Sequence, residues 1–194
     1  MVAPVTRAVL PIATERLLLR PFAPDDADAL HAIRSRPEVV RYLYDGPMSH
    51  AEAVEVARRR GGETGLEEEG DKLSLAMELR ATGELAGDLV LILRSVAHRQ
   101  GEVGYTLHPG HQGRGLATEG ARAILALGFG VFGLHRIAAR LDGRNAASAR
   151  VLERLGMRRE AHLRENEWVK GEWTDELVYA MLAREWRGLA ESPI

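Results

Sequence analysis

The chain has 194 residues, of which 45% are hydrophobic, and its formal net charge is −2. This size fits a single domain over residues 1–194 with a buried core, and the near-balanced charge gives no reason to expect nucleic acid or an anionic membrane as a partner. The sequence has no cysteine, which excludes disulfides, thiolate metal sites and a cysteine nucleophile.

Targeting signals are not evident in the sequence. No apolar run approaches the ~18 residues of a membrane span. The first residues are broken by Pro4 and Pro11 and lack the apolar stretch of a signal peptide. Together with the absence of cysteine, these features predict a cytoplasmic protein. Basic residues are almost all arginine, with Lys72 and Lys170 the two lysines, which suggests GC-rich codons and a bacterial source.

The first half of the chain predicts one strand and two helices. Leu17–Leu19, in "TERLLLRPF", favour a strand, and "APDDADALHAIRS" favours a helix with Asp25 as its cap. Residues 49–60 favour a second helix, in which Ser49 and Glu52 form a capping box. The acidic, glycine-rich residues 61–72 fit either a mobile solvated loop or a lid that attracts a cationic substrate.

From Lys72 the hydrophobic period changes to two, which predicts three strands, "KLSLAMEL", "LAGDLVLIL" and "GEVGYTL", in an antiparallel meander. A helix over residues 117–132 and the strand "HRIAARL" follow. The segment "NAASARVLERLGM" favours a helix that begins at Asn145 and stops at Gly156. Two last strands, about 158–169 and 176–182, complete the order β-α-α-β-β-β-α-β-α-β-β.

The turn "HPGHQGRGLATEG" opens the helix after the meander and has the composition of a phosphate-binding loop. Gly110 and Gly115 have the spacing of a Walker A loop, but Leu116 and Ala117 stand where that loop needs Lys and Ser or Thr. A dinucleotide-binding loop needs a third glycine where this chain has Thr118. Both types of nucleotide site are therefore disfavoured.

A third pattern, Q/R-x-x-G-x-G/A, is met by Gln112, Gly115 and Ala117. With it, "GEVGYTLHPGHQGRGLATEGARAIL" and "NAASARVLERLGM" resemble the GNAT superfamily of acetyl-CoA-dependent N-acetyltransferases. "TERLLLRPF" and "VKGEWTDELVYAML" resemble its ribosomal-protein (Rim-type) branch. The resemblance covers about residues 14–184. It implies an α/β (α+β) fold: a mixed, mostly antiparallel sheet of six to seven strands with flanking helices, splayed between two central strands.

The resemblance implies acetyl-CoA as co-substrate. Turn glycines let backbone N–H groups approach a pyrophosphate, and a helix N-terminus adds donors. A plain strand-to-helix turn would explain the glycines alone. By resemblance, the strand before the loop binds the pantetheine, and the Leu107 N–H polarises the thioester carbonyl. The expected cofactor contacts are Thr106, Leu107, His108, Gln112, Gly113, Arg114, Gly115, Leu116, Ala117, Thr118, Asn145 and Ser148.

Direct acetyl transfer needs a neutral amine and a proton for the leaving thiol. Glu102 is the candidate base, although an exposed strand carboxylate explains it equally well; Glu84 and Asp88 are alternatives. Many superfamily members carry a Tyr seven residues after the equivalent of Asn145, where this chain has Leu152. The resemblance therefore assigns the thiol proton to Ser148, whose other interpretation is a small helix-packing residue.

The leading function is an N-acetyltransferase that modifies a protein N-terminal α-amine. The alternatives are a small-molecule amine acetyltransferase, with an antibiotic, a polyamine or an amino-acid-like acceptor, and a non-catalytic acyl-CoA-binding protein. His108 and His111 lack a nearby carboxylate in sequence, so no metal site is expected. Trp168 and Trp173 fit either the acceptor cleft or a homodimer contact.

Overall fold

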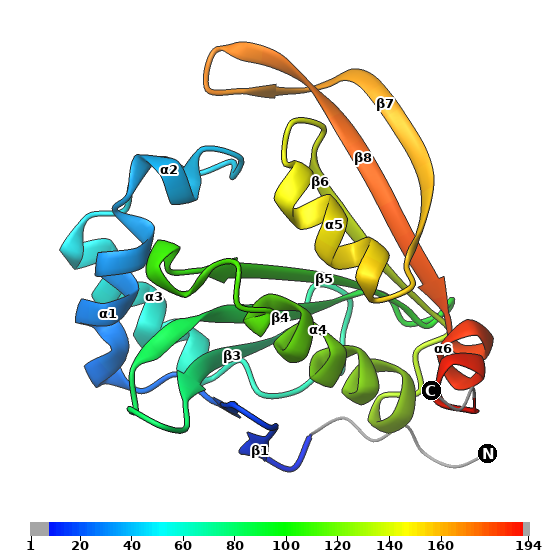
Figure 1. Ribbon diagram of the computed structural model, residues 1–194, viewed down its shortest axis with the longest axis horizontal. Coiled ribbons are helices and arrows are strands. Elements are labelled where there is room, and N and C mark those ends of the chain that lie inside the picture. The colour runs from blue at the N-terminus through cyan, green and yellow to red at the C-terminus, as the bar shows by residue number, and fades with distance from the viewer. Residues whose placement is uncertain (1–7, 192–194) are drawn as a thin grey trace.

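The computed structural model describes residues 8–191, so Pro4 lies outside the described residues. Its centre is one eight-stranded sheet in the order β1-β2-β3-β4-β5-β6-β8-β7 (Figure 1). The strands are β1 (Ile12–Ala13), β2 (Leu17–Arg20), β3 (Lys72–Leu79), β4 (Leu85–Ser95), β5 (Gln100–Leu107), β6 (Arg136–Asp142), β7 (Arg158–Val169) and β8 (Glu172–Leu182). The predicted mixed, mostly antiparallel sheet is confirmed, with β1 as an additional short strand.

Helices flank the sheet on both faces. Their bounds are η1 (Pro24–Asp26), α1 (Ala27–Arg34), α2 (Pro37–Val40), α3 (His50–Gly61), η2 (Pro109–His111), α4 (Leu116–Ala126), η3 (Leu127–Val131), α5 (Ala146–Arg154) and α6 (Ala183–Glu191). Helices α1 and α3 pack on one face, and α4 and α5 on the other (Figure 1). Helix α6 was not predicted, and no helix within residues 8–191 is long and apolar enough to cross a membrane.

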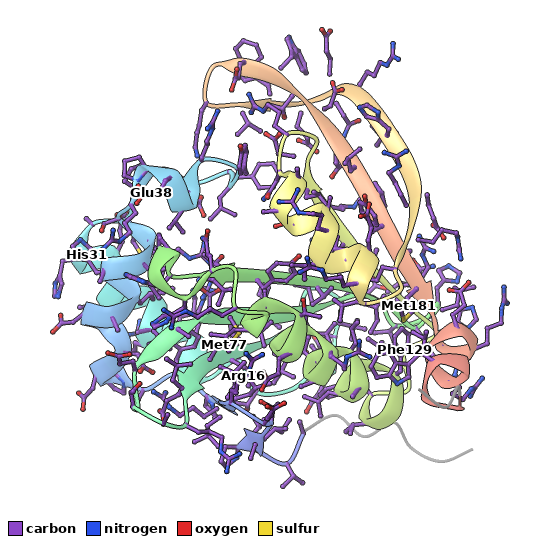
Figure 2. The ribbon with its side chains drawn as sticks, viewed as in Figure 1. Arg16, His31, Glu38, Met77, Phe129 and Met181 are labelled. Carbon is purple, nitrogen blue, oxygen red and sulfur yellow. The ribbon has the colours of Figure 1, made fainter. Side chains whose placement is uncertain are left out.

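The period-two pattern of β3 explains this layering. Leu73, Leu75 and Met77 are fully buried and belong to the core beneath α4, where Met77 is visible in Figure 2. Ala76 points to the opposite face and packs in the cluster that contains Leu30 of α1. Because successive side chains of a strand alternate between faces, an apolar strand can anchor a helix layer on each side.

Local capping chemistry fixes where α3 begins. As predicted, Ser49 Oγ accepts a hydrogen bond from the Glu52 N–H, and the Glu52 carboxylate accepts one from the Ser49 N–H at 2.7 Å. The helix predicted before it is present as α1, but Asp25 is not its cap. Asp26, rather than Asp25, accepts from the Ala23 N–H at 2.7 Å, and its carboxylate also pairs with Arg20. Burial opposes the ionisation of Asp26, but these bonds outweigh it and lower its pKa.

The acidic loop at residues 61–72 is anchored to the sheet. The Asp71 carboxylate accepts hydrogen bonds from the N–H groups of Glu67 and Glu68 at 2.7 Å, and its carbonyl accepts one from Leu93 N at 2.9 Å. No residue of this loop lines either of the two clefts described below. The structure therefore gives no support to the lid interpretation.

The predicted splay lies between β5 and β6, the parallel pair of this sheet. Their pairing is limited to Gln100, Gly101 and Glu102, which face residues 136–138. Beyond Glu102 the two strands separate, while β5 stays paired with β4 as far as Leu107. The C-terminal end of β5, residues 103–107, therefore has no neighbouring strand on the side of β6.

Candidate active site

A cleft of about 410 Å³ opens where β5 and β6 separate, and we call it the cofactor cleft. Residues from α2, β5, α4 and α5, and from the loops after α2 and after β5, form its walls. They include Tyr105, Thr106 and Leu107 of β5, Gln112, Gly113 and Gly115 of the turn, Ala117 and Thr118 of α4, and Asn145 and Ser148 at the start of α5. The fold thus brings most of the predicted cofactor residues together.

The end of the glycine loop (residues 109–115) and the first turn of α4 supply unpaired donors to this cleft. Gly113 and Gly115 have φ of +74° and +78°, the left-handed conformation that side chains disfavour. Helix α4 begins at Leu116, so the N–H groups of its first turn have no partner inside the helix. The Thr118 Oγ1 is buried and has no hydrogen-bond partner within the described residues. Phosphate oxygens match these donors in charge and in chemistry, so the loop fits the pyrophosphate of a coenzyme A.

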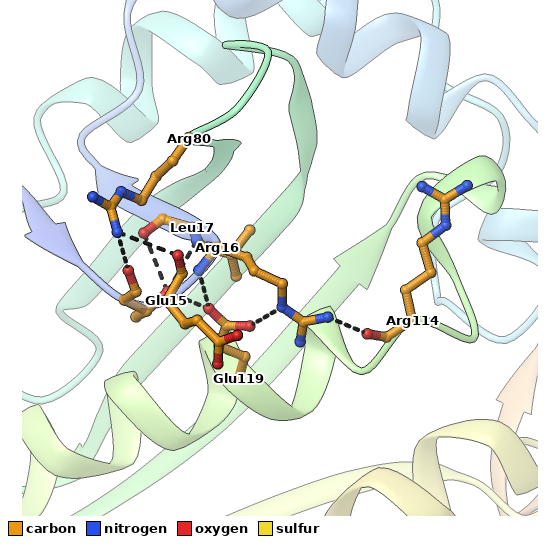
Figure 3. Close-up of polar contacts among 7 residues, drawn as sticks. Glu15, Arg16, Leu17, Arg80, Arg114 and Glu119 are labelled. Carbon is orange, nitrogen blue, oxygen red and sulfur yellow. Dashed lines mark hydrogen bonds and ion pairs between the residues drawn. The ribbon is translucent and has the colours of Figure 1, made fainter.

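The loop is held from behind by the segment before β2. Glu119 accepts hydrogen bonds from Thr14 Oγ1 at 2.6 Å and from both Arg16 N and Arg16 Nε at 2.7 Å (Figure 3). Arg16 Nη1 then donates to the Arg114 carbonyl at 2.7 Å, while the Arg114 side chain extends away from this network. This support was not predicted from the sequence, because "TER" indicates only the start of a strand and Glu119 lies 103 positions away.

The end of β5 presents its backbone to the cleft. His108 N donates to Ala86 O at 2.8 Å, and Leu107 is the register partner of Gly87. Hydrogen bonds alternate along an antiparallel pair, so the Leu107 N–H points to the opposite edge, which is the edge that β6 leaves open. This N–H therefore faces the splay, where the resemblance requires it.

Several predicted contacts do not line the cofactor cleft. The His108 N–H is already used by β4, and its ring nitrogen accepts from Gly110 N at 3.1 Å. Leu116 is 3% exposed and packs into the core. Arg114 is exposed and has no acidic partner in residues 8–191. His108 and Leu116 are thus placed to shape the loop, while Arg114 is free to reach an anion.

Two hydroxyl groups near the start of α5 could protonate the leaving thiol, that of Ser148 on α5 and that of Tyr105 on β5. Asn145 Oδ1 accepts from Ser148 N at 3.1 Å, which confirms its capping role. Leu152 is buried in the core. Tyr105, which the sequence analysis missed, donates its hydroxyl to the Ser148 carbonyl at 3.1 Å, and burial raises the pKa of Tyr105 to about 12. Its proton is therefore retained at neutral pH, beside the Ser148 side chain.

A second cleft, of about 610 Å³, contains Glu102, and we call it the acceptor cleft. Glu102 and Tyr105 differ by an odd number of positions along β5, so their side chains point to opposite faces of the strand. Tyr42 and Leu43 line both clefts. The two clefts therefore approach each other from opposite faces of the sheet at the splay.

Glu102 is held by arginines. It accepts from Arg94 at 3.1 Å and lies 3.7 Å from Arg140 Nε. Arg140 also donates to Glu176 at 2.9 Å, a carboxylate that is 3% exposed and accepts a further bond from Asn166 at 3.1 Å. These ion pairs fix the position of the Glu102 carboxylate in the wall of the acceptor cleft.

Carboxylates outnumber arginines in the acceptor cleft. Five acidic residues line it, against Arg94, Arg136 and Arg140. The acidic residues are Glu102, Asp142, Glu167, Asp175 and Glu176. Partial burial, followed by the charges of Glu167, Glu176 and Glu102, raises the pKa of Tyr44 above its ordinary value. A cleft with this balance attracts a cationic ligand such as a protonated amine.

The alternative bases lie elsewhere. Asp88 is 2% exposed and pairs with Arg34 at 2.9 Å and Arg60 at 3.0 Å, which tie α1 and α3 to β4. Burial opposes its ionisation, but the two guanidinium groups lower its pKa. Glu84 is exposed and lies 4.0 Å from His111. Neither residue lines the acceptor cleft: Asp88 ties helices to the sheet, and Glu84 lies at the surface.

The tryptophans and histidines do not extend the site. Trp168 and Trp173 form an edge-to-face pair at the β7–β8 tip, with ring centroids 5.3 Å apart, and both are more than half exposed. Neither lines the acceptor cleft. Within the part of the chain that the structure describes, no group of three or more His, Asp or Glu residues could hold a metal ion.

Comparisons with known proteins agree with this geometry. The family model of the acetyltransferase (GNAT) domain matches residues 16–158. The uncharacterised N-acetyltransferase YnaD of Bacillus subtilis is 33% identical over 90% of this chain and 98% of its own length. The crystal structure of a GNAT-family acetyltransferase from Bacillus anthracis superposes with a TM-score of 0.81 at 30% identity, covering 91% of this chain and 100% of that one.

A more distant structure, spermidine N-acetyltransferase from Vibrio cholerae in complex with CoA and spermine, has a TM-score of 0.75 at 22% identity and covers 90% of this chain and 99% of that one. At that identity the likeness is one of fold. The family model, the relative from Bacillus subtilis and the glycine loop at the splay together place the chain in the GNAT acetyltransferase family, as an acyltransferase.

Proposed function

We propose that this acetyltransferase transfers the acetyl group of acetyl-CoA to a primary amine by direct attack, and that the acceptor is the α-amine of a peptide N-terminus. The observation that carries the proposal is the meeting of two clefts at the splay. One has the donors that an anionic cofactor needs, and the other has an excess of carboxylates. In this proposal the amine approaches the thioester from the acceptor cleft, past Tyr42 and Leu43, which line both clefts.

Each part of the cofactor cleft has a role in this reaction. Acetyl-CoA, when bound, supplies the acetyl group activated as a thioester. The N–H groups of the glycine loop and the Thr118 hydroxyl bind the pyrophosphate. The Leu107 N–H donates to the acyl oxygen, where negative charge develops during the attack. Tyr105 of β5 and Ser148 of α5 line the same cleft and hold hydroxyl protons for the leaving thiol.

The state of Glu102 favours an acceptor of modest basicity. An α-amine titrates near ~8 and a lysine amine near ~10.4, so about a tenth of the first but under a thousandth of the second is neutral at pH 7. Glu102 is paired with Arg94 and Arg140, so its carboxylate oxygens are already engaged by two guanidinium groups. The cleft therefore suits an amine that loses its proton to water, with Glu102 attracting and orienting it.

A polyamine is the second candidate acceptor. The excess of carboxylates in the acceptor cleft favours a ligand with several positive charges. The fold relative from Vibrio cholerae is a spermidine N-acetyltransferase. Such an acceptor has amines of lysine-like basicity, so its acetylation should rise steeply with pH.

A thiol-release assay with acetyl-CoA separates these acceptors. The panel contains peptides with free N-termini, the same peptides with blocked N-termini and a free lysine side chain, and spermidine. We expect release with the free N-termini and mass-spectrometric acetylation at the α-amine. Turnover of spermidine alone would favour the second candidate. Binding of acetyl-CoA without turnover of any amine in the panel would contradict the proposed function.

A further inference from the structure

The tip of the β7–β8 hairpin projects beyond the rest of the sheet and lies above α2 in Figure 1. Strand β6 pairs with β8 only as far as Glu176, whereas β7 and β8 stay paired as far as Val169 and Glu172. We call residues 167–174 the hairpin arm. The arm is a ribbon of two strands, and a ribbon of this kind has little stability of its own in water. Contacts outside the sheet therefore decide where the arm lies.

Polar contacts hold the arm on two sides. The Arg144 guanidinium, which follows β6, donates to the Glu172 carboxylate at 2.8 Å, and both side chains are about half exposed. At the tip itself, Lys170 Nζ donates to the Val40 carbonyl of α2 at 2.6 Å, across 130 positions of the chain. This second bond is partly buried, so water competes with it less than with the exposed ion pair.

The Val40 carbonyl belongs to the turn that carries a wall of both clefts. The same oxygen accepts the Leu43 N–H at 2.9 Å, and Tyr42 and Leu43 line the acceptor cleft as well as the cofactor cleft. Val40 is 3% exposed, so its buried side chain anchors this turn. On the arm, Val169 lines the acceptor cleft and immediately precedes Lys170. The bond from Lys170 therefore joins two walls of the acceptor cleft.

We propose that Lys170 is a specificity-determining residue that selects the acceptor by its shape. By tying the arm to α2, it holds the Val169 wall close to the wall formed by Tyr42 and Leu43. The group next to the reacting amine must then fit between these walls. This inference rests on the proposed acetylation of a peptide N-terminus and adds that the first residue of the peptide is small. Without the bond, the arm moves away from α2 and the cleft admits larger groups.

Two peptides that differ only in their first residue, alanine or tryptophan, test the proposal in the thiol-release assay with acetyl-CoA. We expect the wild-type protein to prefer the alanine peptide in kcat/KM. Lys170→Met removes the donor and keeps a long unbranched side chain, and its preference should fall about tenfold, the effect of one charge-assisted bond. The change should appear in the KM values of the peptides and leave the KM for acetyl-CoA unaltered, because Lys170 does not line the cofactor cleft. Lys170→Arg keeps a charged donor and should restore most of the preference.

Hydrogen–deuterium exchange of the unliganded proteins measures the same bond without a substrate. Lys170→Met should speed exchange at the N–H groups of Leu43 and Met48, which donate to Val40 and to Arg34. Exchange in the central strands should stay at the wild-type rate, which establishes that the variant is folded. Lys72→Met is the matched control, since it makes the same change at the start of β3, in a residue that lines neither cleft. It should alter neither exchange nor peptide preference.

Two results would overturn the inference and leave the proposed function intact. One is a wild-type protein that acetylates both peptides equally well. The other is a Lys170→Met variant with wild-type peptide preference or with wild-type exchange at Leu43 and Met48. A wild-type protein that acetylates neither peptide would overturn the proposed peptide acceptor, and the selection of its first residue with it.

Discussion

The support behind the glycine loop depends on Glu119, and Glu119→Gln tests it. The carboxylate accepts three hydrogen bonds of 2.6–2.7 Å, two at Oε1 and the Arg16 ion pair at Oε2. Glutamine keeps one acceptor oxygen and places an NH₂ group against the guanidinium. A charge-assisted bond contributes about 1.5–3 kcal/mol when buried. Because 44% of the Arg16 side chain is exposed, screening reduces the expected loss of unfolding free energy to about 1–2 kcal/mol.

The effect of Glu119→Gln should depend on pH. Burial opposes ionisation of Glu119, but the bonds from Thr14 and Arg16 lower its pKa. Its stabilising contribution is therefore present above the unfolded pKa of about 4.3 and is lost as pH falls through the lower folded value. The difference in unfolding free energy between wild type and variant should reach its full value at pH 7 and should vanish at strongly acidic pH.

Urea denaturation at several pH values measures the free energy of unfolding, and calorimetry measures the CoA affinity, which depends on the glycine loop. We expect CoA affinity to fall about tenfold, because the Arg114 carbonyl loses its anchor. Glu68→Gln makes the same chemical change at an exposed carboxylate far from the clefts and should change neither quantity. A Glu119→Gln protein with wild-type stability and wild-type CoA affinity would refute the role of the network.

Three further substitutions test the site. Gly115→Val forces a β-branched residue into φ +78° at the loop, so a folded variant should lose most of its CoA affinity by calorimetry. Ser148→Ala and Tyr105→Phe identify the residue that protonates the leaving thiolate. Steady-state kinetics should show about a 100-fold loss of kcat in one of the two variants, with the KM for acetyl-CoA unchanged. Full turnover in both variants would make water the proton donor. Glu102→Gln distinguishes two roles of Glu102. If Glu102 is the general base, the kcat of the variant should be lowered, and the deficit should shrink above the pKa of the acceptor amine. If Glu102 orients the amine, the KM for the acceptor should be raised at every pH of the pH–rate profile.

Features that depend on local chemistry were predictable from the sequence. The Ser49–Glu52 capping box and the left-handed Gly156 after α5, with φ +83°, follow from residues a few positions apart. The alternation in β3 and β4 identified the central strands for the same reason. In β3, Leu73, Leu75 and Met77 recur at every second residue and share one face of the strand, so a window of a few residues reveals the pattern.

Features that depend on distant contacts were not predictable. Arg16 meets Glu119 across 103 positions, and nothing in either local sequence indicates the pairing. Helix α6 is stabilised by Trp186 stacking on Phe129, a tertiary contact that outweighs weak local signals. Tyr105 became a candidate donor only when the fold placed α5 beside β5. The resemblance to the GNAT superfamily instead indicated position 152 of α5, where many members carry a tyrosine and this chain has Leu152.

The most direct test of the two-cleft arrangement is a crystal structure of the protein with CoA and an acetylated amine product. The account predicts the pantetheine between β5 and β6 with its thiol end at Leu107, the pyrophosphate on residues 113–118, and the amine entering from the Glu102 side. A cofactor bound away from the glycine loop, or an amine that enters through the cofactor cleft, would contradict it.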